Sequence, residues 1–422
     1  MLDRTLQPTL SPITKINFVE PTIIKINEFS KLYWMKEVLD ETTRIELHFN
    51  AGSIRSIQKI AGSVNSLLFS GTATKTSTQI HEELDSLGAF IDQELGQEVA
   101  IVSLYCLRKN AKDAIDILFD AIQNVSFHSH EVEDNIREKK QQFLISSEKV
   151  SILARREFQK QLFANSPNYA RQIELQDYEN ITVEGLKNFH QEFYLQGLLK
   201  VVLVGNMEQN FVNHLHEKLI PLARQNKTEY EKQFINNKGT FHIEKTDAVQ
   251  TAIRIGMPLF NKSHQDFIDF QILQTILGDY FGSRLMSNIR EDKGYTYGIG
   301  SGLSEANQTG YFIIATEVGK EFVSSTLHEI KVEIERLCNE LIGEEELTLV
   351  KNYVLGQLLK HADGPNAMMD LFMAVQLQSK GFEFYDSFIE RVNSITSNDL
   401  QTIANKYLNW NNLTIITAGS SN

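Results

Sequence analysis

The stretch "ITVEGLKNFHQEFYLQGLLKVVLVGN", residues 181–206, returns in altered form as "ITSNDLQTIANKYLNWNNLTIITAGS", residues 395–420. The two copies start 395 minus 181, or 214, residues apart. They keep leucines, one aromatic ring and a closing glycine in register: Leu186 with Leu400, Phe193 with Tyr407, Leu199 with Leu413, and Gly205 with Gly419. A repeat of about half the chain length predicts two halves that share one fold.

Each copy is typical of a helix that leads into a buried strand. We expect Thr182 in the first copy and Ser397 in the second to cap the helix N-terminus, because short hydroxyl side chains accept hydrogen bonds from free backbone amides. The strands "KVVLVG" and "TIITAG" are rich in β-branched residues and end at a glycine turn. The same unit therefore closes both halves.

The beginnings of the halves agree more weakly. Residues 43–53, "TRIELHFNAGS", and residues 250–260, "QTAIRIGMPLF", alternate as half-buried strands do. A helix, a glycine turn, two strands and long helical patterns (about 110–165 and 320–378) follow in each half. This order predicts an α+β fold with two homologous α/β-sandwich halves, each a mostly antiparallel sheet covered by helices.

The polar stretch "RQNKTEYEKQFINNKGT", residues 224–240, has few apolar side chains and is the best linker in the chain. We therefore expect an N-terminal domain over residues 1–223 and a C-terminal domain over residues 241–422.

Composition excludes several classes of protein. The 422 residues include 42% hydrophobic and 23% charged residues, and the net charge of −13 argues against a general nucleic-acid binder. The basic runs are short, such as residues 137–140. Cys106 and Cys338 are too few for a disulfide scaffold. Without a signal sequence or a membrane span we expect a cytoplasmic protein, or a periplasmic one if a signal segment has been removed.

The stretch "AGSVNSLLFSGT", residues 61–72, predicts a helix with an unusual second face. Apolar residues form one stripe at helical spacing: Ile57, Ile60, Ala61, Val64, Leu67 and Leu68. Gly62, Asn65, Ser66 and Phe69 share another stripe, where an enzyme would carry ligands. No H-E-x-x-H or H-x-x-E-H motif occurs, and we interpret the pairs His128/His130 and His214/His216 as a solvated turn and a helix surface.

The stretch "SRLMSNIREDKGYTYGIGSGL", residues 283–303, offers a second candidate. We expect a helix that ends near Arg290, a turn at Gly294, and Tyr295 and Tyr297 on one face of a strand. Arginine near a helix C-terminus and tyrosine in a strand are also common for structural reasons. The functional alternative is that Arg290 and Tyr297 hold and polarise a peptide carbonyl.

With these stretches in place, residues 15–420 resemble the pitrilysin, insulinase and mitochondrial-processing-peptidase family. Active members of that family read A-H-x-x-E-H-x-x-F-x-G-T where this chain reads residues 61–72. The two zinc-ligand histidines fall on Gly62 and Ser66, and the general-base glutamate falls on Asn65. The family's distal glutamate ligand falls near residues 141–143, with Glu148 close by. The resemblance implies a degenerate zinc motif and no metal or other cofactor in this chain.

The second half keeps what the first has lost. The family's pattern L-R-E-x-x-G-x-x-Y is matched from Ile289 to Tyr297, with only the leading leucine changed. The resemblance implies that Arg290 and Tyr297 grip the substrate backbone and support the developing oxyanion. One departure is that Asp92 and Gln93 stand where the family often carries Asn-Ala, in the strand to which an extended substrate adds.

The resemblance implies a non-catalytic subunit of a heterodimeric bacterial zinc metallopeptidase. A homologous partner would carry the zinc, and the two chains would enclose a peptide substrate. The isolated chain would not be a peptidase, and a homodimer of it is plausible. Two alternatives remain open at this point: a structural scaffold subunit, and a protein that binds peptides without hydrolysing them.

Overall fold

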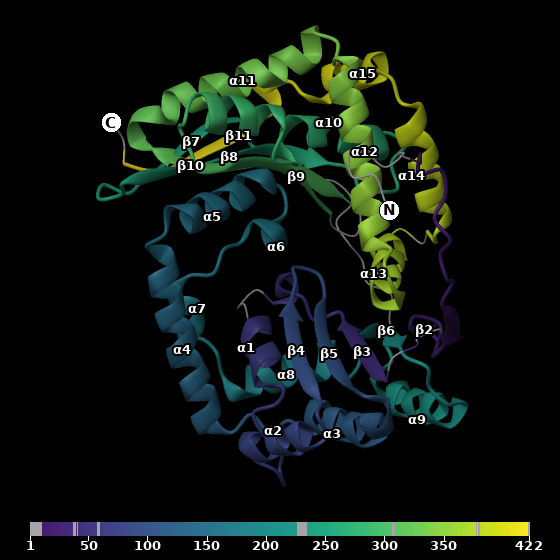
Figure 1. The fold of residues 1–422 in the computed structure, drawn as a ribbon. Coiled ribbons are helices and arrows are strands. Elements are labelled where there is room, and N and C mark those ends of the chain that lie inside the picture. The colour runs from purple at the N-terminus through teal and green to yellow at the C-terminus, as the bar shows by residue number, and fades with distance from the viewer. Residues whose placement is uncertain are drawn as a thin grey trace, which may run out of the picture.

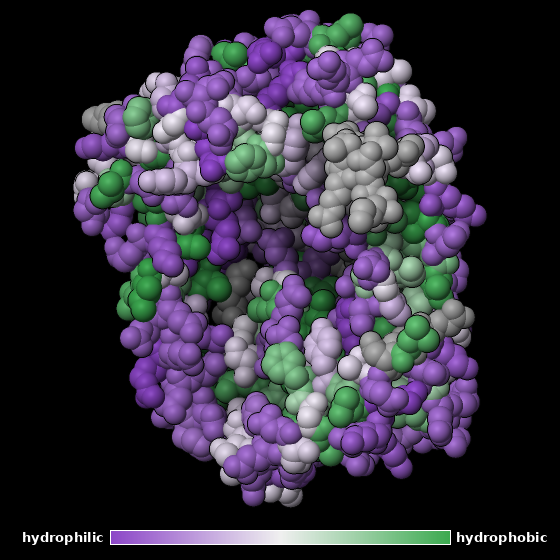
Figure 2. All heavy atoms as spheres, viewed as in Figure 1, coloured by the Kyte–Doolittle hydropathy of each residue, from purple (hydrophilic) through white to green (hydrophobic). Residues whose placement is uncertain are grey.

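A computed structural model describes residues 11–36, 39, 41–56, 60–225, 234–305, 309–376, 378 and 380–420. Two β-sheets, each with a layer of helices on its outer face, are stacked so that their inner faces point toward each other (Figure 1). The molecule is hollowed between the two halves (Figure 2).

The first half is a six-stranded sheet in the order β1-β2-β6-β3-β5-β4. Its strands are β1 (Thr22–Lys25), β2 (Lys31–Met35), β3 (Thr42–Phe49), β4 (Phe90–Leu95), β5 (Ala100–Leu107) and β6 (Leu198–Val204). Its helices are α1 (Ala61–Leu67), α2 (Ser77–Ser86), α3 (Ala111–Asn124), α4 (Ser129–Ser147), α5 (Val150–Leu162), α6 (Pro167–Ala170), α7 (Leu175–Glu179), α8 (Val183–Phe193) and α9 (Gln209–Leu219). Neighbouring strands are antiparallel, except that β2 pairs with β6 in parallel.

The second half is a five-stranded sheet in the order β7-β11-β8-β10-β9. Its strands are β7 (Gly239–Glu244), β8 (Gln250–Leu259), β9 (Ile299–Glu305), β10 (Gly310–Gly319) and β11 (Thr414–Gly419). Its helices are α10 (Phe267–Gly278), the π-helix η4 (Met286–Asp292), α11 (Val323–Asn339), α12 (Glu344–His361), α13 (Pro365–Gln376), α14 (Glu383–Ser394) and α15 (Ser397–Tyr407). Only β7 and β11 pair in parallel.

The two sheets are versions of one topology, which confirms the predicted fold class. The repeated units are α8 with β6 and α15 with β11, and each strand lies in its sheet beside one parallel and one antiparallel neighbour. Thr182 caps α8 by accepting a hydrogen bond from the amide of Gly185, as expected. The expectation for Ser397 was wrong. Thr396 caps α15, since its side chain accepts a hydrogen bond from the amide of Asp399. Thr396 is also the residue that the offset of 214 pairs with Thr182.

Each half contributes one helix that packs on the sheet of the other half. Helix α5, from the first half, packs on β8 and β11 of the second sheet through buried residues such as Phe158 and Ala252. Helix α13, from the second half, packs on β6 of the first sheet, and Arg44 of β3 forms an ion pair with Asp370 of α13. Each helix partly covers the inner face of the opposite sheet (Figure 1). The hollow therefore lies beside these two helices.

Strand β7 begins at Gly239, inside the stretch that we expect to link the domains. Residues 226–233 of that stretch lie outside the described part of the chain. The division into residues 1–223 and 241–422 stays a prediction.

Candidate functional site

Helix α1 is the helix expected at the degenerate zinc motif. From Ile60 onward its apolar stripe is buried in the core of the first half, as predicted: Ile60, Ala61, Val64, Leu67 and Leu68 are each at most 5% exposed. Ile57 lies outside the described residues. The helix contacts α4, α8 and the edge strand β4. Its remaining surface faces α4 and solvent.

The second stripe of α1 is divided between solvent and the core. Ser66 is exposed, whereas Asn65 and Phe69 are only 6% and 4% exposed. The Asn65 side-chain oxygen accepts a hydrogen bond of 3.0 Å from the hydroxyl of buried Tyr194. The Gln93 side-chain amide donates a hydrogen bond to the backbone carbonyl of Asn65. Asn65 is therefore engaged in a structural contact, where an active relative would need a free carboxylate.

A lysine fills the place where a metal would be held. The Lys139 ammonium, on α4, donates a hydrogen bond of 2.9 Å to the hydroxyl of Ser66. A Cβ atom added to Gly62 would lie 3.9 Å from the same nitrogen. Burial lowers the pKa of Lys139. A cation thus stands between the two positions that would carry the metal-binding histidines, and it would repel a zinc ion.

The residues expected near a distal ligand have other partners. Phe143 packs edge-on against Tyr178, with ring centroids 5.9 Å apart. Gln142 donates to Glu138, and Glu148 forms an ion pair with Lys245 of the second half. Within the described ranges no group of three or more His, Cys, Asp and Glu side chains is placed to hold a metal ion. Because zinc needs three protein ligands, this site does not fit zinc.

The two histidine pairs noted in the sequence include residues with structural contacts. His128 lies 3.3 Å from the Thr72 carbonyl, and its ring stacks on His130. His214 lies 2.9 Å from Asp116 on the neighbouring helix α3. Cys106 is buried in β5, and burial raises its thiol pKa to about 11, so it is protonated at neutral pH.

Arg290 lies on η4, a π-helix, and such turns are frequent at functional sites. Its guanidinium group is 4.6 Å above the ring of Phe281 and donates a hydrogen bond of 2.8 Å to Glu291. The preceding Ile289 is fully buried and anchors the turn in the core. Arg290 is therefore held on two sides while part of it stays in contact with solvent.

The two tyrosines after the turn are not on a strand, contrary to our expectation. Strand β9 begins only at Ile299, because Gly294, with a φ of +66°, reverses the chain first. Tyr295 then stacks on Phe322, with centroids 4.8 Å apart, whereas Tyr297 is 94% exposed. No hydrogen bond joins Tyr297 to Arg290 among the residues described. Strand β9 itself is an outer strand of its sheet.

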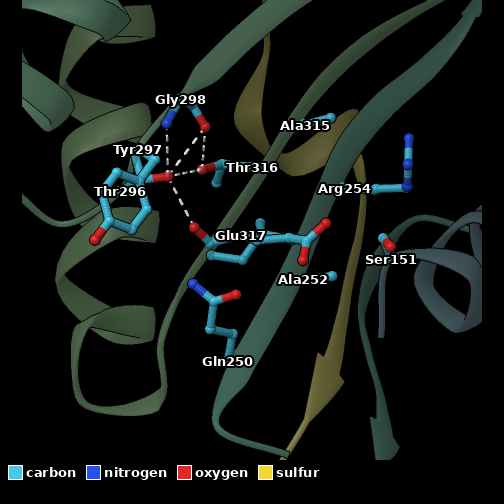
Figure 3. Close-up of a pocket in the computed structure, with 11 residues that line it drawn as sticks. Ser151, Gln250, Ala252, Arg254, Thr296, Tyr297, Gly298, Ala315, Thr316 and Glu317 are labelled. Atoms are coloured by element: carbon cyan, nitrogen blue, oxygen red, sulfur yellow. Dashed lines mark hydrogen bonds between the residues drawn. The ribbon is translucent and has the colours of Figure 1, made fainter. Parts of the chain in front are cut away.

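Thr296 sets the position of the exposed Tyr297. Its hydroxyl donates to the Glu317 carbonyl at 2.8 Å and accepts from the Gly298 amide at 3.1 Å. The Thr316 hydroxyl lies 2.9 Å away and completes this network (Figure 3). The loop is thus fastened to β10, and Tyr297 projects from it without a hydrogen bond of its own in the described structure. A phenol held in this way is free to donate to a ligand.

Tyr297 borders a cavity of about 340 Å³ on the inner face of the second sheet. Its lining comes from α5, β8, β10 and the loop before β9: Ser151, Gln250, Ala252, Ile253, Arg254, Thr296, Tyr297, Gly298, Ala315, Thr316 and Glu317 (Figure 3). Arg254 is the one lining residue with a positive charge. Neither Arg254 nor this cavity is apparent from the sequence, because strand pairing brings the lining together.

Strand β4 is the outer strand beside α1. Asp92 is exposed on it, while Gln93 points to α1 and bonds to the Asn65 carbonyl. The departure noted in the sequence thus has a structural consequence, because Gln93 ties the edge strand to the altered helix.

Comparison with known proteins identifies the class. Residues 36–167 match the family model described as insulinase, peptidase family M16, and residues 180–354 match the model described as the peptidase M16 inactive domain. The chain belongs to this family, the pitrilysin and insulinase-like peptidases.

Individual relatives agree with this assignment. A Rickettsia felis protein named "Uncharacterized zinc protease" is 27% identical over 69% of this chain and 71% of its own length. A Bacillus subtilis zinc protease of similar name is 21% identical over 80% of this chain and 83% of its own. The solved structure of a peptidase M16 inactive domain from Pseudomonas fluorescens superposes with a TM-score of 0.87 at 21% identity, covering 96% of this chain and 99% of that one. At 21% sequence identity, this superposition shows only that the two chains share a fold.

In the part of the chain that the structure covers, none of the helices is both long enough and apolar enough to cross a bilayer.

Proposed function

We propose that this chain is the zinc-less subunit of a two-chain zinc metallopeptidase, to which it contributes Arg290 and Tyr297 for peptide binding and oxyanion stabilisation. One observation carries the proposal. The helix that would hold zinc presents Gly62 and Ser66 around the Lys139 ammonium, while the second half keeps an exposed tyrosine on a fastened loop. The zinc would belong to a homologous partner chain.

The chemistry of this chain's contribution follows from the two side chains. When a peptide carbonyl is attacked, negative charge develops on its oxygen, and a positioned donor stabilises that charge more than it stabilises the ground state. The Tyr297 phenol supplies such a donor. Arg290, held over Phe281 and beside Glu291, is oriented to bind a carbonyl of the peptide backbone. Both act on the substrate and neither needs a metal of its own.

The comparisons support the proposal at the level of the family. Residues 180–354 match a domain described as inactive, and several relatives are named zinc proteases. The proposal adds the heterodimer, the roles of Arg290 and Tyr297, and the assignment of residues 1–223 and 241–422 as the two homologous domains.

The test is to look for a homologous chain bearing H-x-x-E-H that co-purifies with this one, and to assay each chain and their mixture. We expect no cleavage of a fluorogenic peptide library by this chain alone and cleavage by the mixture. In the mixture, Tyr297→Phe and Arg290→Ala each lower kcat/KM by roughly tenfold or more, the usual loss for one oxyanion or substrate-binding donor. Tyr353→Phe, on the outer helix α12, is the matched control and leaves the rate unchanged.

Two results would count against the proposal. Full activity of the mixture with both variants would favour the scaffold alternative. Peptide binding by this chain, with no hydrolysis in any mixture, would favour a binding protein.

A further inference from the structure

The cavity beside Tyr297 contains a cationic group that the proposed function does not use. Arg254 lies on β8, and its Nε atom is buried with no hydrogen-bond partner within the described structure. Unpaired buried donors of this kind are rare in native proteins and call for an explanation. Glu317 lines the same cavity, but no ion pair within 4.0 Å joins it to Arg254 among the described residues.

The charge around Arg254 favours an anion. Arg155 of α5 lies near enough that, after burial, it is the next cause of the lowered pKa of Arg254. The positive charges of Arg254 and Arg155 therefore outnumber the negative charge of Glu317 in this region. Helix α5 also begins here, at Val150, with Ser151 in the cavity wall and without a capping side chain or an acidic residue in its first turn. Its free amides add to the positive potential.

The shape of the cavity admits part of a peptide. Ala252, Ala315 and Gly298 are small lining residues, so they leave the space in front of Arg254 open. A cavity of about 340 Å³ has room for a terminal residue of a peptide. A planar carboxylate matches the two parallel donors of a guanidinium group.

We propose that this cavity binds a carboxylate group of the peptide through Arg254. The inference rests on the proposed function, because it names the class of substrate for the same site. With its carboxylate on Arg254, a peptide runs past Tyr297 at the rim of the cavity, so the preceding peptide groups lie within reach of the phenol. The preferred substrates are then peptides with a carboxylate a few residues beyond the cleaved bond, at the C-terminus or in an acidic side chain.

The test is a binding measurement on the isolated full-length chain. Fluorescence anisotropy compares one short labelled peptide as the free acid, as the C-terminal amide, and as the amide with aspartate in its last position. We expect the free acid to bind roughly tenfold more tightly than the amide, the typical gain for a charge-assisted pair. Tighter binding of the aspartate peptide than of the plain amide would show that a side chain also serves.

Variants connect the preference to Arg254. Arg254→Gln should reduce affinity for the free acid to that for the amide, while Arg254→Lys should keep part of the preference. Arg108→Gln, at an exposed ion pair with Glu41 in the first half, is the control and should keep all of it. Thermal melts of Arg254→Gln check folding. We expect no loss of melting temperature, because the change removes a partly buried guanidinium group whose Nε atom has no hydrogen-bond partner in the described structure.

Equal binding of acid and amide by the wild-type chain, or a preference that survives Arg254→Gln, overturns the inference. The proposed function is judged separately, by cleavage in the mixture and its dependence on Tyr297. A mixture that cleaves acid and amide peptides alike would retain the function and reject the carboxylate site. An inactive mixture, together with an Arg254-dependent preference for the free acid, would reject the proposed function and retain the carboxylate site.

Discussion

The ammonium of Lys139 lies 2.9 Å from the hydroxyl oxygen of Ser66, so a hydrogen bond ties α4 to α1 at this point. In an active relative, a zinc ion would join these helices through ligands at the positions of Gly62 and Ser66. Here a single hydrogen bond from a half-buried cation joins them.

The first prediction concerns the return of a metal site. In the double variant Gly62→His/Ser66→His we expect no bound zinc, because Lys139 keeps a positive charge between the imidazoles. Adding Lys139→Glu removes that charge and supplies a third ligand, so zinc should bind. The zinc content of the double and triple variants is measured after dialysis. Zinc bound equally well by the double variant would show that Lys139 does not exclude the metal.

The second prediction concerns the orientation of Arg290. Phe281 is 66% exposed and lies under the guanidinium group, so Phe281→Ala should leave the melting temperature unchanged. It should lower kcat/KM of the mixture by about two- to fivefold, the value of an exposed cation–π contact. Leu341→Ala, also at an exposed apolar residue, is the control. Unchanged kcat/KM in Phe281→Ala would remove this ring from the account.

The third prediction separates two glycines by stability. Gly62 lies in a helix and a Cβ there would make only ordinary contacts, so Gly62→Ala should stabilise the chain by roughly 0.5 kcal/mol. Gly294 has a φ of +66°, so Gly294→Ala should cost about 1 kcal/mol. Urea unfolding measures both free energies. A destabilised Gly62→Ala would mean that glycine is needed at that position.

The fourth prediction is a rise of stability with pH. Burial, together with Lys31 on the neighbouring strand, lowers the pKa of Lys200 from 10.5 to about 8. Between these values the unfolded chain binds more protons than the folded chain, so the free energy of unfolding increases with pH. The gain from this group is at most about 3 kcal/mol, because Lys200 keeps some contact with water.

Chemical denaturation from pH 7.5 to 9.5 tests this dependence. Lys200→Met should remove most of the rise, whereas the exposed Lys187→Met should keep it. A slope that is the same in all three proteins would contradict the assigned environment of Lys200.

Much of the fold could be predicted from sequence because its signals are local. The alternation in residues 43–53 and 250–260 gave the central strands β3 and β8, and the repeat at 181 and 395 gave the duplication. The cap at residue 396 was missed by one position, although the repeat offset itself points to Thr396.

The site was less predictable because its decisive contacts are tertiary. Lys139 belongs to a short basic run, and only the packing of α4 on α1 brings it to Ser66. Its position three residues before Gln142, on one helical face with the expected distal ligand, was the one available signal. Tyr297 lies in a loop and not in the predicted strand, because the positive φ of Gly294 and the hydrogen bonds of Thr296 hold the chain there. β-Propensity alone does not take these effects into account.

We propose above all that this chain supplies groups that hold the substrate and holds no catalytic metal. The most direct measurement is the zinc content of the isolated chain after purification in zinc-containing buffer and dialysis. The account predicts no stoichiometric zinc and no chelator-sensitive cleavage of peptides. One zinc per chain, lost together with peptidase activity on adding a chelator, would contradict it.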